Sequence, residues 1–293
     1  MAFIQLSQVC KSFPSAAGSR DVLHNVSLSV DRGEFVAVVG AMGSGKSTLI
    51  NLMAGLVAPD RGTVEIDGVA VTGVRRDTAI VFQNYSLLPW FSAAENVRLA
   101  VEATFPSWSA ADQKARAIQM LELVGLGSAQ HRRPGQLSGG MRQRVAIARA
   151  FAIDPTLLYL DEPFGALDAL TRETLQQELT SLCRSEGRSV TTVMITNNIE
   201  EAMLLADRIV PLTRGPRATL GASIPVALPR PRSASALLHD ADAVAVRSSI
   251  IDALTSGASG ASGPRRQADV QTSTNFAVRV AADAAALAAG VDR

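Results

Sequence analysis

The chain has 293 residues, of which 47% are hydrophobic, and its 28 basic residues nearly balance 27 acidic ones, which leaves a net charge of +1. A chain of this size can bury one α/β core with a helical insertion, or two modest domains. A surface that binds nucleic acid usually carries a strong basic excess, so the charge balance argues against a nucleic-acid partner.

The cysteines and the apolar segments indicate a soluble protein of the cytosol. Cys10 and Cys183 lack the paired spacing of zinc sites, and two cysteines do not make a disulfide framework in a chain of this size, so both are expected to be free and structural. No segment approaches about 18 uninterrupted apolar residues, and the first five residues lack the basic start of a signal peptide. We expect the chain to meet a membrane only through a partner.

The first 39 residues predict a small antiparallel β layer that leads into a glycine-rich loop. The apolar or alternating segments Ile4–Val9, Val26–Val30 and Phe35–Val39 are its expected strands, and a polar loop is expected at Pro14–Arg20.

Residues 40–47 form a complete phosphate-binding loop, Gly-Ala-Met-Gly-Ser-Gly-Lys-Ser, between a strand and the predicted helix Thr48–Gly55. Its glycines let backbone N–H groups turn toward phosphates, Lys46 adds positive charge at the β and γ phosphates, and the Ser47 hydroxyl is a ligand for Mg²⁺. A plain glycine turn is the alternative, but it needs no Lys-Ser pair. A nucleoside triphosphate is the expected ligand, and the candidate residues are Gly40, Gly43, Ser44, Gly45, Lys46 and Ser47.

After this helix the pattern returns to strands and then becomes helical. Strands are predicted at Thr63–Gly68 and Thr78–Phe82. From Ser92 to Gly125 apolar residues recur at helical spacing, with one helix expected at Ala111–Leu126, so residues from about 90 to 150 are predicted to form an inserted helical subdomain. Buried strands at Leu157–Leu160 and Val190–Ile195, separated by the helix Leu170–Arg184, then predict a mixed core sheet with flanking helices.

Beyond Arg232 the composition changes to Ala, Ser and Gly. Residues 233–254 are predicted to be a helical extension, with one amphipathic helix at Ala236–Leu254. Residues 255–293 are predicted to be disordered, since Ser256–Gly263 has the composition of a flexible linker and few large apolar residues follow it. A frayed helix at Asn275–Val291 is the alternative.

Two adjacent carboxylates, Asp161 and Glu162, follow an apolar strand. In enzymes with a phosphate-binding loop, an acid at this place holds Mg²⁺ and a second acid orients or deprotonates the attacking water. We assign Asp161 to the metal and Glu162 to the water; capping of a helix start is the alternative. Gln83, which follows another strand, is a candidate for hydrogen bonds to Mg²⁺-bound water and to the attacking water.

A second candidate anion site lies at Ser138, Gly139 and Gly140, directly before the predicted helix Arg144–Phe151. Exposed N–H groups and the positive end of a helix favour an anion there. A second phosphate site on one chain suggests closure over a neighbour's nucleotide, and a plain capped helix is the alternative.

In the order and spacing of these motifs, the chain resembles the nucleotide-binding subunits of ATP-binding-cassette (ABC) transporters. The resemblance covers residues from about 3 to 232 and rests on the phosphate loop, Gln83, Leu-Ser-Gly-Gly at 137–140, Asp-Glu at 161–162 and Gly-Ala-Leu-Asp at 165–168. It implies an α/β fold, a P-loop NTPase cassette with a RecA-like core, an antiparallel β subdomain and an inserted α-helical subdomain.

The resemblance also implies roles for individual residues. Phe13 matches the aromatic residue that stacks on adenine, and Thr48 extends the nucleotide-binding loop. Gln83 matches the glutamine that senses Mg²⁺ and the permease. Ser138 and Gly140 match the signature that contacts the opposite subunit's γ-phosphate, and Asp168 matches the acid that lines the dimer seam.

The implied cofactors are ATP and Mg²⁺, with two ATP molecules held in a head-to-tail dimer. The implied partners are transmembrane permease subunits, a second ATPase subunit in a homo- or heterodimer, and a periplasmic or lipoprotein solute-binding protein reached through the complex. The implied place is the cytoplasmic face of the membrane.

Asn197 departs from the family pattern, because a switch histidine is expected after the strand that ends in Thr196. Asn can hydrogen-bond a γ-phosphate but cannot carry a charge. The exchange is expected to cost about 1 kcal/mol, near tenfold in rate, since charge-assisted hydrogen bonds contribute more than neutral ones. Slower hydrolysis is therefore expected.

Within the family, the chain looks most like importers of nitrate, nitrite or cyanate, and related importers of sulfonates and taurine are the runner-up. Residues Leu87–Trp90 are candidates for contact with the permease, or for burial in the helical subdomain. A soluble cassette protein of DNA repair or translation is a rival class, but a coiled-coil insertion, zinc-type cysteine pairs and a tandem cassette are not apparent in the sequence. An ATP clamp that closes without hydrolysis is a third class, which Asn197 keeps open.

Overall fold

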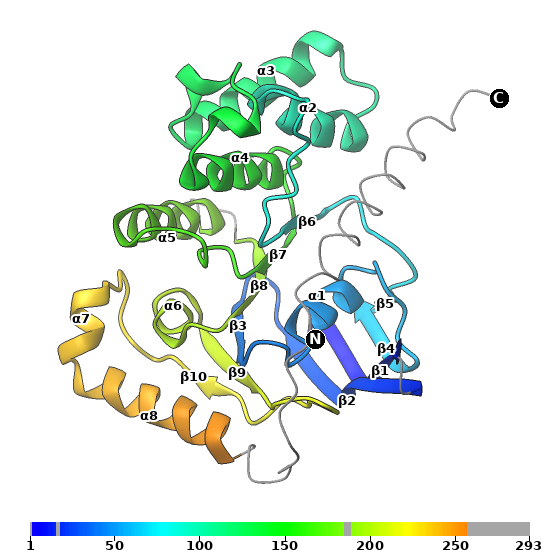
Figure 1. The fold of residues 1–293 in the computed structure, drawn as a ribbon, viewed down its shortest axis with the longest axis vertical. Coiled ribbons are helices and arrows are strands. Elements are labelled where there is room, and N and C mark those ends of the chain that lie inside the picture. Colours follow the sequence, from blue (N-terminus) through cyan, green and yellow to red (C-terminus); the bar gives the residue numbers. More distant parts are fainter. Residues whose placement is uncertain (1, 16–17, 185–188, 257–293) are drawn as a thin grey trace. The chain divides into compact units, whose positions relative to one another are not determined.

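The computed structural model describes residues 2–15, 18–184 and 189–256, and the predicted linker and tail beyond Ser256 lie outside this part of the chain. In the described residues the strands form two sheets (Figure 1). A four-stranded antiparallel sheet has the order β2-β1-β4-β5, and a six-stranded sheet has the order β10-β9-β3-β8-β7-β6. The strands of the first sheet are β1 Ile4–Ser15, β2 Gly18–Val30, β4 Arg61–Ile66 and β5 Val69–Ala70. Those of the second are β3 Phe35–Gly40, β6 Thr78–Val81, β7 Leu157–Asp161, β8 Thr191–Thr196, β9 Arg208–Leu212 and β10 Ile224–Pro225.

Helices join and cover these strands. The first helix, α1, follows β3, and α2, α3 and α4 belong to the segment between β6 and β7, which lies over the β6–β7 end of the core sheet (Figure 1). The remaining helices alternate with strands or follow the last one. Their bounds are α1 Lys46–Met53, α2 Ala93–Thr104, α3 Ala110–Leu123, the short 3-10 turns η1 Gly127–Ala129 and η2 Pro134–Gln136, α4 Gly139–Phe151, α5 Ala169–Cys183, α6 Ile199–Leu205, α7 Ala234–His239 and α8 Ala241–Ser256. No helix in the described part of the chain is long and apolar enough to cross a membrane.

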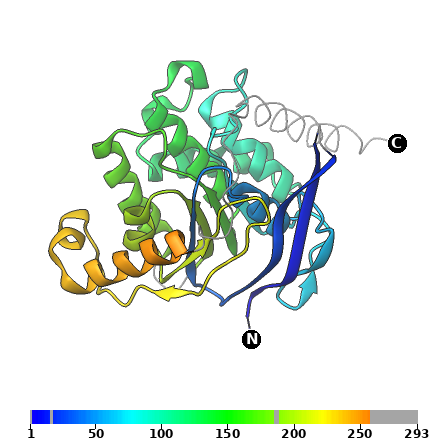
Figure 2. The same cartoon turned by 60° about the horizontal axis from the view of Figure 1, so that its bottom comes forward.

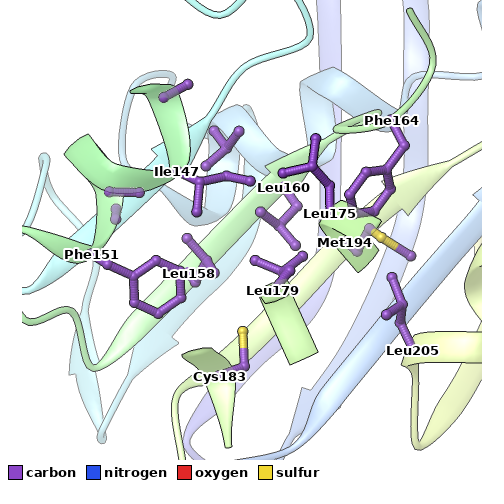
Figure 3. Packing of buried hydrophobic residues seen from close by; sticks show 14 of the residues in the cluster. Ile147, Phe151, Leu158, Leu160, Phe164, Leu175, Leu179, Cys183, Met194 and Leu205 are labelled. Carbon is purple, nitrogen blue, oxygen red and sulfur yellow. The ribbon is translucent and has the colours of Figure 1, made fainter. Parts of the chain in front are cut away.

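The core sheet is buried on both faces, which explains its uninterrupted apolar strands. Val36 and Val38 of β3 belong to the core that β3 shares with α1 and the antiparallel sheet, whereas Ala37 and Val39 belong to the core on the opposite face. Parallel strands covered on both sides require apolar residues at every position. Figure 2 places the β1–β2 hairpin and the C-terminal helices on opposite sides of the core sheet. The close view in Figure 3 has residues of α4, β7 and α5, including Ile147, Leu158 and Leu179, packed in the second core.

The expected helical insertion, the flanking strands and the helix after the phosphate loop are confirmed, with small shifts at their ends. The prediction that Phe35–Val39 belongs to the antiparallel layer is wrong, because β3 lies between β8 and β9 and is parallel to both. The prediction of a polar loop at Pro14–Arg20 is also wrong. The described residues of this segment, 14–15 and 18–20, continue the hairpin, with Phe13 opposite Arg20 and Ser15 opposite Gly18. A solvent-exposed ribbon needs backbone pairing but no apolar alternation, so its sequence gave no strand signal.

Two helix predictions are corrected, one at its start and the other at a break in its middle. The helix expected at Arg144 begins at Gly139, because the Ser138 hydroxyl accepts a hydrogen bond from the Met141 N–H at 3.2 Å and caps it. The single helix expected at Ala236–Leu254 is two helices, α7 and α8. Asp240 separates them with an extended backbone, and its carboxylate accepts a hydrogen bond from the Ala243 N–H at 2.9 Å, which caps α8.

The C-terminal helices share the core of the six-stranded sheet. Leu237, Ala243 and Ile250 are buried in the same cluster as the core sheet. The Arg232 guanidinium donates hydrogen bonds to the carbonyls of Met203 and Ala206, at 2.9 and 2.6 Å, and so ties the segment before α7 to the end of α6.

Cys183 is buried, and burial raises the pKa of its thiol to about 12. A thiol held protonated in this way is unreactive, as expected for a structural cysteine. Cys10 is also free and is partly exposed.

Removal of the Tyr159 hydroxyl tests the packing of α1 on β7. Tyr159 is fully buried, and its hydroxyl donates to the Met53 carbonyl, at the end of α1, at 3.1 Å. Tyr159→Phe is expected to lower the free energy of unfolding by about 1 kcal/mol and the midpoint of thermal unfolding by about 2–4 °C, because a buried carbonyl loses its partner. The matched control is Thr255→Val, which removes an exposed helical hydroxyl. Equal midpoints for the two variants would contradict the assigned contribution.

Candidate active site

The phosphate loop runs from the end of β3 to the start of α1. Gly43 and Gly45 have positive φ angles of 76° and 100°, which glycine adopts at low cost. At Gly40 a Cβ would come within 2.9 Å of the Ser44 hydroxyl and 3.0 Å of the Leu212 carbonyl, so only glycine fits without displacement. The Ser44 hydroxyl is buried and has no hydrogen-bond partner among the described residues. An unpartnered buried hydroxyl at this place fits a loop that binds phosphate.

Lys46 lies inside this loop at the first residue of α1. Its ammonium donates to the carbonyls of Gly40 and Ala41, at 3.0 and 3.1 Å. It also forms an ion pair with Glu162, at 3.2 Å, and both side chains are largely buried, with exposures of 5% and 13%. The cation is thus shared between the loop and the carboxylate that follows β7.

The paired carboxylates lie at the carboxyl end of β7, beside the loop. The Ser47 hydroxyl donates to Asp161 at 3.3 Å, and the Gln83 amide donates to Glu162 at 3.4 Å. Burial raises the pKa of Asp161 to about 6, and the nearby Glu162 carboxylate adds to this effect. Four residues predicted from separate motifs, Ser47, Gln83, Asp161 and Glu162, therefore meet at one place.

Glu162 has an unusual backbone for a residue other than glycine. Its φ is 44°, and its N–H donates to the Ile195 carbonyl of β8 at 2.9 Å. A strained backbone persists where the surrounding structure holds it, and such residues cluster at functional sites. Here the backbone of Glu162 is bonded to β8 and its carboxylate contacts Lys46.

The signature residues Ser138, Gly139 and Gly140 lie at the start of α4, where Ser138 is the N-cap. Ser138 and Gly140 line a shallow pocket of about 290 Å³ with residues of α4 and α5. A Cβ at Gly140 would come within 2.5 Å of the Thr171 methyl group. Among the hydrogen bonds and ion pairs of the described residues, none joins Ser138, Gly139 or Gly140 to the phosphate loop.

Phe13, Asn197 and Asp168 are each exposed or partly exposed. Phe13 lies on the β1–β2 hairpin at 37% exposure, with the Lys11 ammonium 5.4 Å from its ring centre. Asn197 directly follows β8, and no hydrogen bond of the described residues holds its side chain. Asp168 caps α5 and accepts a hydrogen bond from the Thr171 N–H at 3.0 Å, which lowers its pKa. Thr48 is the third residue of α1 and is half-buried.

Sequence reasoning missed Arg149, an arginine that joins α4 to the residues directly after Gln83. Arg149 donates to the carbonyls of Tyr85 and Ser86 at 2.8 and 2.5 Å, and burial lowers its pKa to about 10. Both acceptors have positive φ angles, 65° and 46°. Residues Tyr85 and Ser86, just after Gln83, are therefore bonded directly to α4, the helix that begins at the signature residues. Neither periodicity nor a short motif marks this arginine, since its partners are backbone atoms far away in the sequence.

Comparisons with known proteins identify relatives that match most of this chain. The ABC transporter family model matches residues 23–165. The nitrate import ATP-binding protein NrtD of Synechococcus elongatus is 48% identical over 252 residues, which cover 86% of this chain and 91% of that protein. The bicarbonate transport ATP-binding protein CmpD of Synechocystis is 45% identical over 86% of this chain and 89% of its own length. The nitrate transport protein NasD of Klebsiella oxytoca is 46% identical over 81% of this chain and 90% of its own length.

Solved structures similar to this chain are also ATP-binding cassettes. The ATP-binding cassette MJ0796, in a dimeric post-hydrolysis state bound to ADP and phosphate, is 32% identical, with a TM-score of 0.69 over 76% of this chain and 98% of that one. A second dimeric structure of the same cassette has the same TM-score at 34% identity. The expected cassette fold is thereby confirmed. The chain belongs to the ATP-binding subunits of the ABC transporter family.

Proposed function

We propose that this chain is the ATP-hydrolysing subunit of a membrane importer for a small inorganic anion, with nitrate the foremost candidate. The relatives described above are named for nitrate and bicarbonate. Both are small planar oxyanions, which favours this class over sulfonates and taurine. Nitrite and cyanate remain in the same class of small anions.

The observation that carries the ATP-hydrolysing part of this proposal is the set of contacts at the phosphate loop. Lys46 contacts Glu162, Glu162 contacts Gln83, and Ser47 contacts Asp161. In the proposed reaction Lys46 leaves the loop carbonyls for the β and γ phosphates of ATP. Glu162 is then free to accept the proton of the attacking water. The water oxygen bonds to the γ-phosphorus of ATP while the bond from that phosphorus to the β–γ bridging oxygen breaks, so that ADP leaves and phosphate is released.

The residues beside the loop fit Mg²⁺ by their chemistry. Ser47, Asp161 and Gln83 offer hydroxyl, carboxylate and amide oxygens, which are the ligands that Mg²⁺ prefers, directly or through water. When bound, the ion neutralises charge on the β and γ phosphates. The raised pKa of Asp161, caused mainly by burial and also by Glu162, fits a site that is stabilised by a cation.

The second site at Ser138 and Gly140 supports a head-to-tail dimer of cassettes. Its helix start is exposed and has no contact with its own phosphate loop among the described residues, which suits the γ-phosphate of a second copy or of a related ATPase. Gly139 and Gly140 allow backbone N–H groups to approach that phosphate. Phe13 is proposed to stack on adenine, and Thr48 to complete the loop.

Permease subunits are the proposed membrane partners, and they hold the chain at the membrane surface. A solute-binding protein joins through them and selects the anion. Trp90, at 61% exposure, remains a candidate contact for the permease.

An anion panel tests this proposal. The complex of this chain with its permease and solute-binding protein is reconstituted in lipid vesicles, and phosphate release is measured with nitrate, nitrite, cyanate, bicarbonate or taurine outside. Nitrate is expected to give the largest stimulation of ATP hydrolysis. Stimulation by taurine alone would overturn the anion class. Binding of ATP without phosphate release under any condition would favour the clamp that closes without hydrolysis.

A further inference from the structure

An ion pair between α5 and α6 is bonded to two loops of the proposed site, the loop after Glu162 and the loop that contains Asn197. Arg172 of α5 and Glu201 of α6 approach each other to 3.5 Å. Neither residue touches the phosphate loop through a described hydrogen bond. Each is bonded instead to a loop that carries a proposed site residue.

Arg172 holds the loop between Glu162 and Asp168. Its guanidinium donates to the carbonyls of Phe164 and Leu167, at 3.4 and 2.8 Å. Phe164 itself is fully buried and lies beside Met194 of β8 in the close view (Figure 3). The loop is therefore fixed at its apolar side by packing and at its backbone by one arginine.

Glu201 holds the loop that contains Asn197. Its carboxylate accepts a hydrogen bond from the Thr196 hydroxyl at 2.9 Å, and the same hydroxyl accepts from the Asn198 N–H at 3.0 Å. The Glu201 N–H in turn donates to the Asn198 side chain at 3.3 Å. The residues before and after Asn197 are thus both tied to Glu201, while the Asn197 side chain is left exposed.

The burial of Glu201 makes this arrangement sensitive to loss of its partner. Glu201 is 5% exposed, and burial raises its pKa, with a smaller contribution from the Glu162 carboxylate. A buried carboxylate that loses its cation is left uncompensated, and the surrounding backbone moves to relieve it. The first groups to move would be the loops bonded to the pair.

We propose that the Arg172–Glu201 pair is a positioning device that sets Asn197 against Glu162 across the γ-phosphate, and this inference rests on the proposed ATP hydrolysis at that site. The pair acts through the two loops and does not touch the nucleotide. A displacement of about 1 Å at a reacting group is enough to cost about a hundredfold in rate, so a partial shift is expected to cost about tenfold.

The test compares matched arginine variants in the full transporter complex. Arg172→Met removes one ion pair and two bonds to carbonyls. Arg116→Met is the control, because Arg116 likewise bonds Asp154 and the carbonyls of Ala152 and Phe151, within the helical insertion. Arg172→Met is expected to lower kcat about tenfold with a change of less than about twofold in the Kd for ATP, whereas Arg116→Met changes neither by more than about twofold.

Three further variants separate positioning from stability. Arg172→Lys keeps a charge opposite Glu201 and is expected to recover part of the lost kcat. Thr196→Val is nearly isosteric and removes the hydroxyl that links the Glu201 carboxylate to the Asn198 N–H, so it should lower kcat even if Arg172→Met fails to fold. The double variant Arg172→Met/Asn197→Ala is expected to lose less than the product of the two single losses, because both act on one arrangement.

The outcomes distinguish this inference from the proposed function. If the parent complex releases no phosphate, the proposed ATPase fails first. If the parent hydrolyses ATP and Arg172→Met and Thr196→Val do so at the same kcat, the positioning role is overturned. A lowered thermal midpoint with unchanged kcat would also overturn it, since the pair would then be purely structural.

Discussion

Glu162→Gln in the assembled complex is expected to lower ATP turnover by at least about a hundredfold, since general-base catalysis of this kind contributes about 10²–10⁴-fold. Glutamine keeps the size of the side chain and can still accept a hydrogen bond, but it cannot accept a proton at neutral pH. The variant should therefore bind ATP as the parent does and accumulate as a closed, ATP-bound dimer. Phosphate release, ATP binding and the mass of the nucleotide-loaded cassette pair are the measurements.

Lys46→Ala separates binding from chemistry at the same site. It removes the only described cation paired with Glu162 within the phosphate loop, so ATP binding itself, or closure of the dimer, is expected to be lost. The matched control for Glu162→Gln is Glu65→Gln, which also replaces one carboxylate by an amide but lies on the antiparallel sheet. Equal turnover in Glu162→Gln and the parent would show that Glu162 is not the base.

Asn197→His is expected to raise turnover several-fold, provided that the imidazole fits where the exposed Asn197 side chain now lies. A charged donor to the γ-phosphate contributes about 1 kcal/mol more than a neutral amide, which corresponds to roughly five- to tenfold in rate. Asn197 directly follows β8 and its side chain has no described partner, so the substitution breaks no described bond. Turnover is measured at saturating ATP in the complex with the permease.

Asn197→Ala supplies the opposite test. The γ-phosphate then loses its hydrogen bond from this position, and turnover is expected to fall. Saturating ATP keeps changes in nucleotide affinity from being read as changes in chemistry. If Asn197→Ala turns over ATP as fast as the parent, the side chain makes no contact that matters for hydrolysis, and the switch role does not belong to this position.

Local motifs predicted the centre of the site because its chemistry depends on short stretches of chain. The phosphate loop needs its glycines, lysine and serine within eight positions, and the paired acids need only to end a buried strand. Ser47, Gln83 and Asp161 were each assigned to Mg²⁺ or to its bound water from their own motifs, without knowledge of the strand order. The structure brings them together through β3, β6 and β7.

Other features depend on partners that are distant in the sequence. An all-apolar segment such as Phe35–Val39 does not say which sheet it joins, and only pairing with β8 and β9 decides it. The break between α7 and α8 depends on a single capping aspartate, Asp240, within an otherwise helical pattern. The bonds from Arg149 and Arg172 to loop carbonyls leave no periodic signal, since any residue type can supply the acceptor carbonyl.

ATP-driven uptake of labelled nitrate tests the central claim most directly. Lipid vesicles carry the whole transporter, with ATP and Mg²⁺ supplied on the side that bears this chain and nitrate with the solute-binding protein on the other. We predict nitrate accumulation that requires ATP and is abolished by Glu162→Gln. Accumulation that proceeds without ATP, or that continues unchanged in Glu162→Gln, would contradict the account.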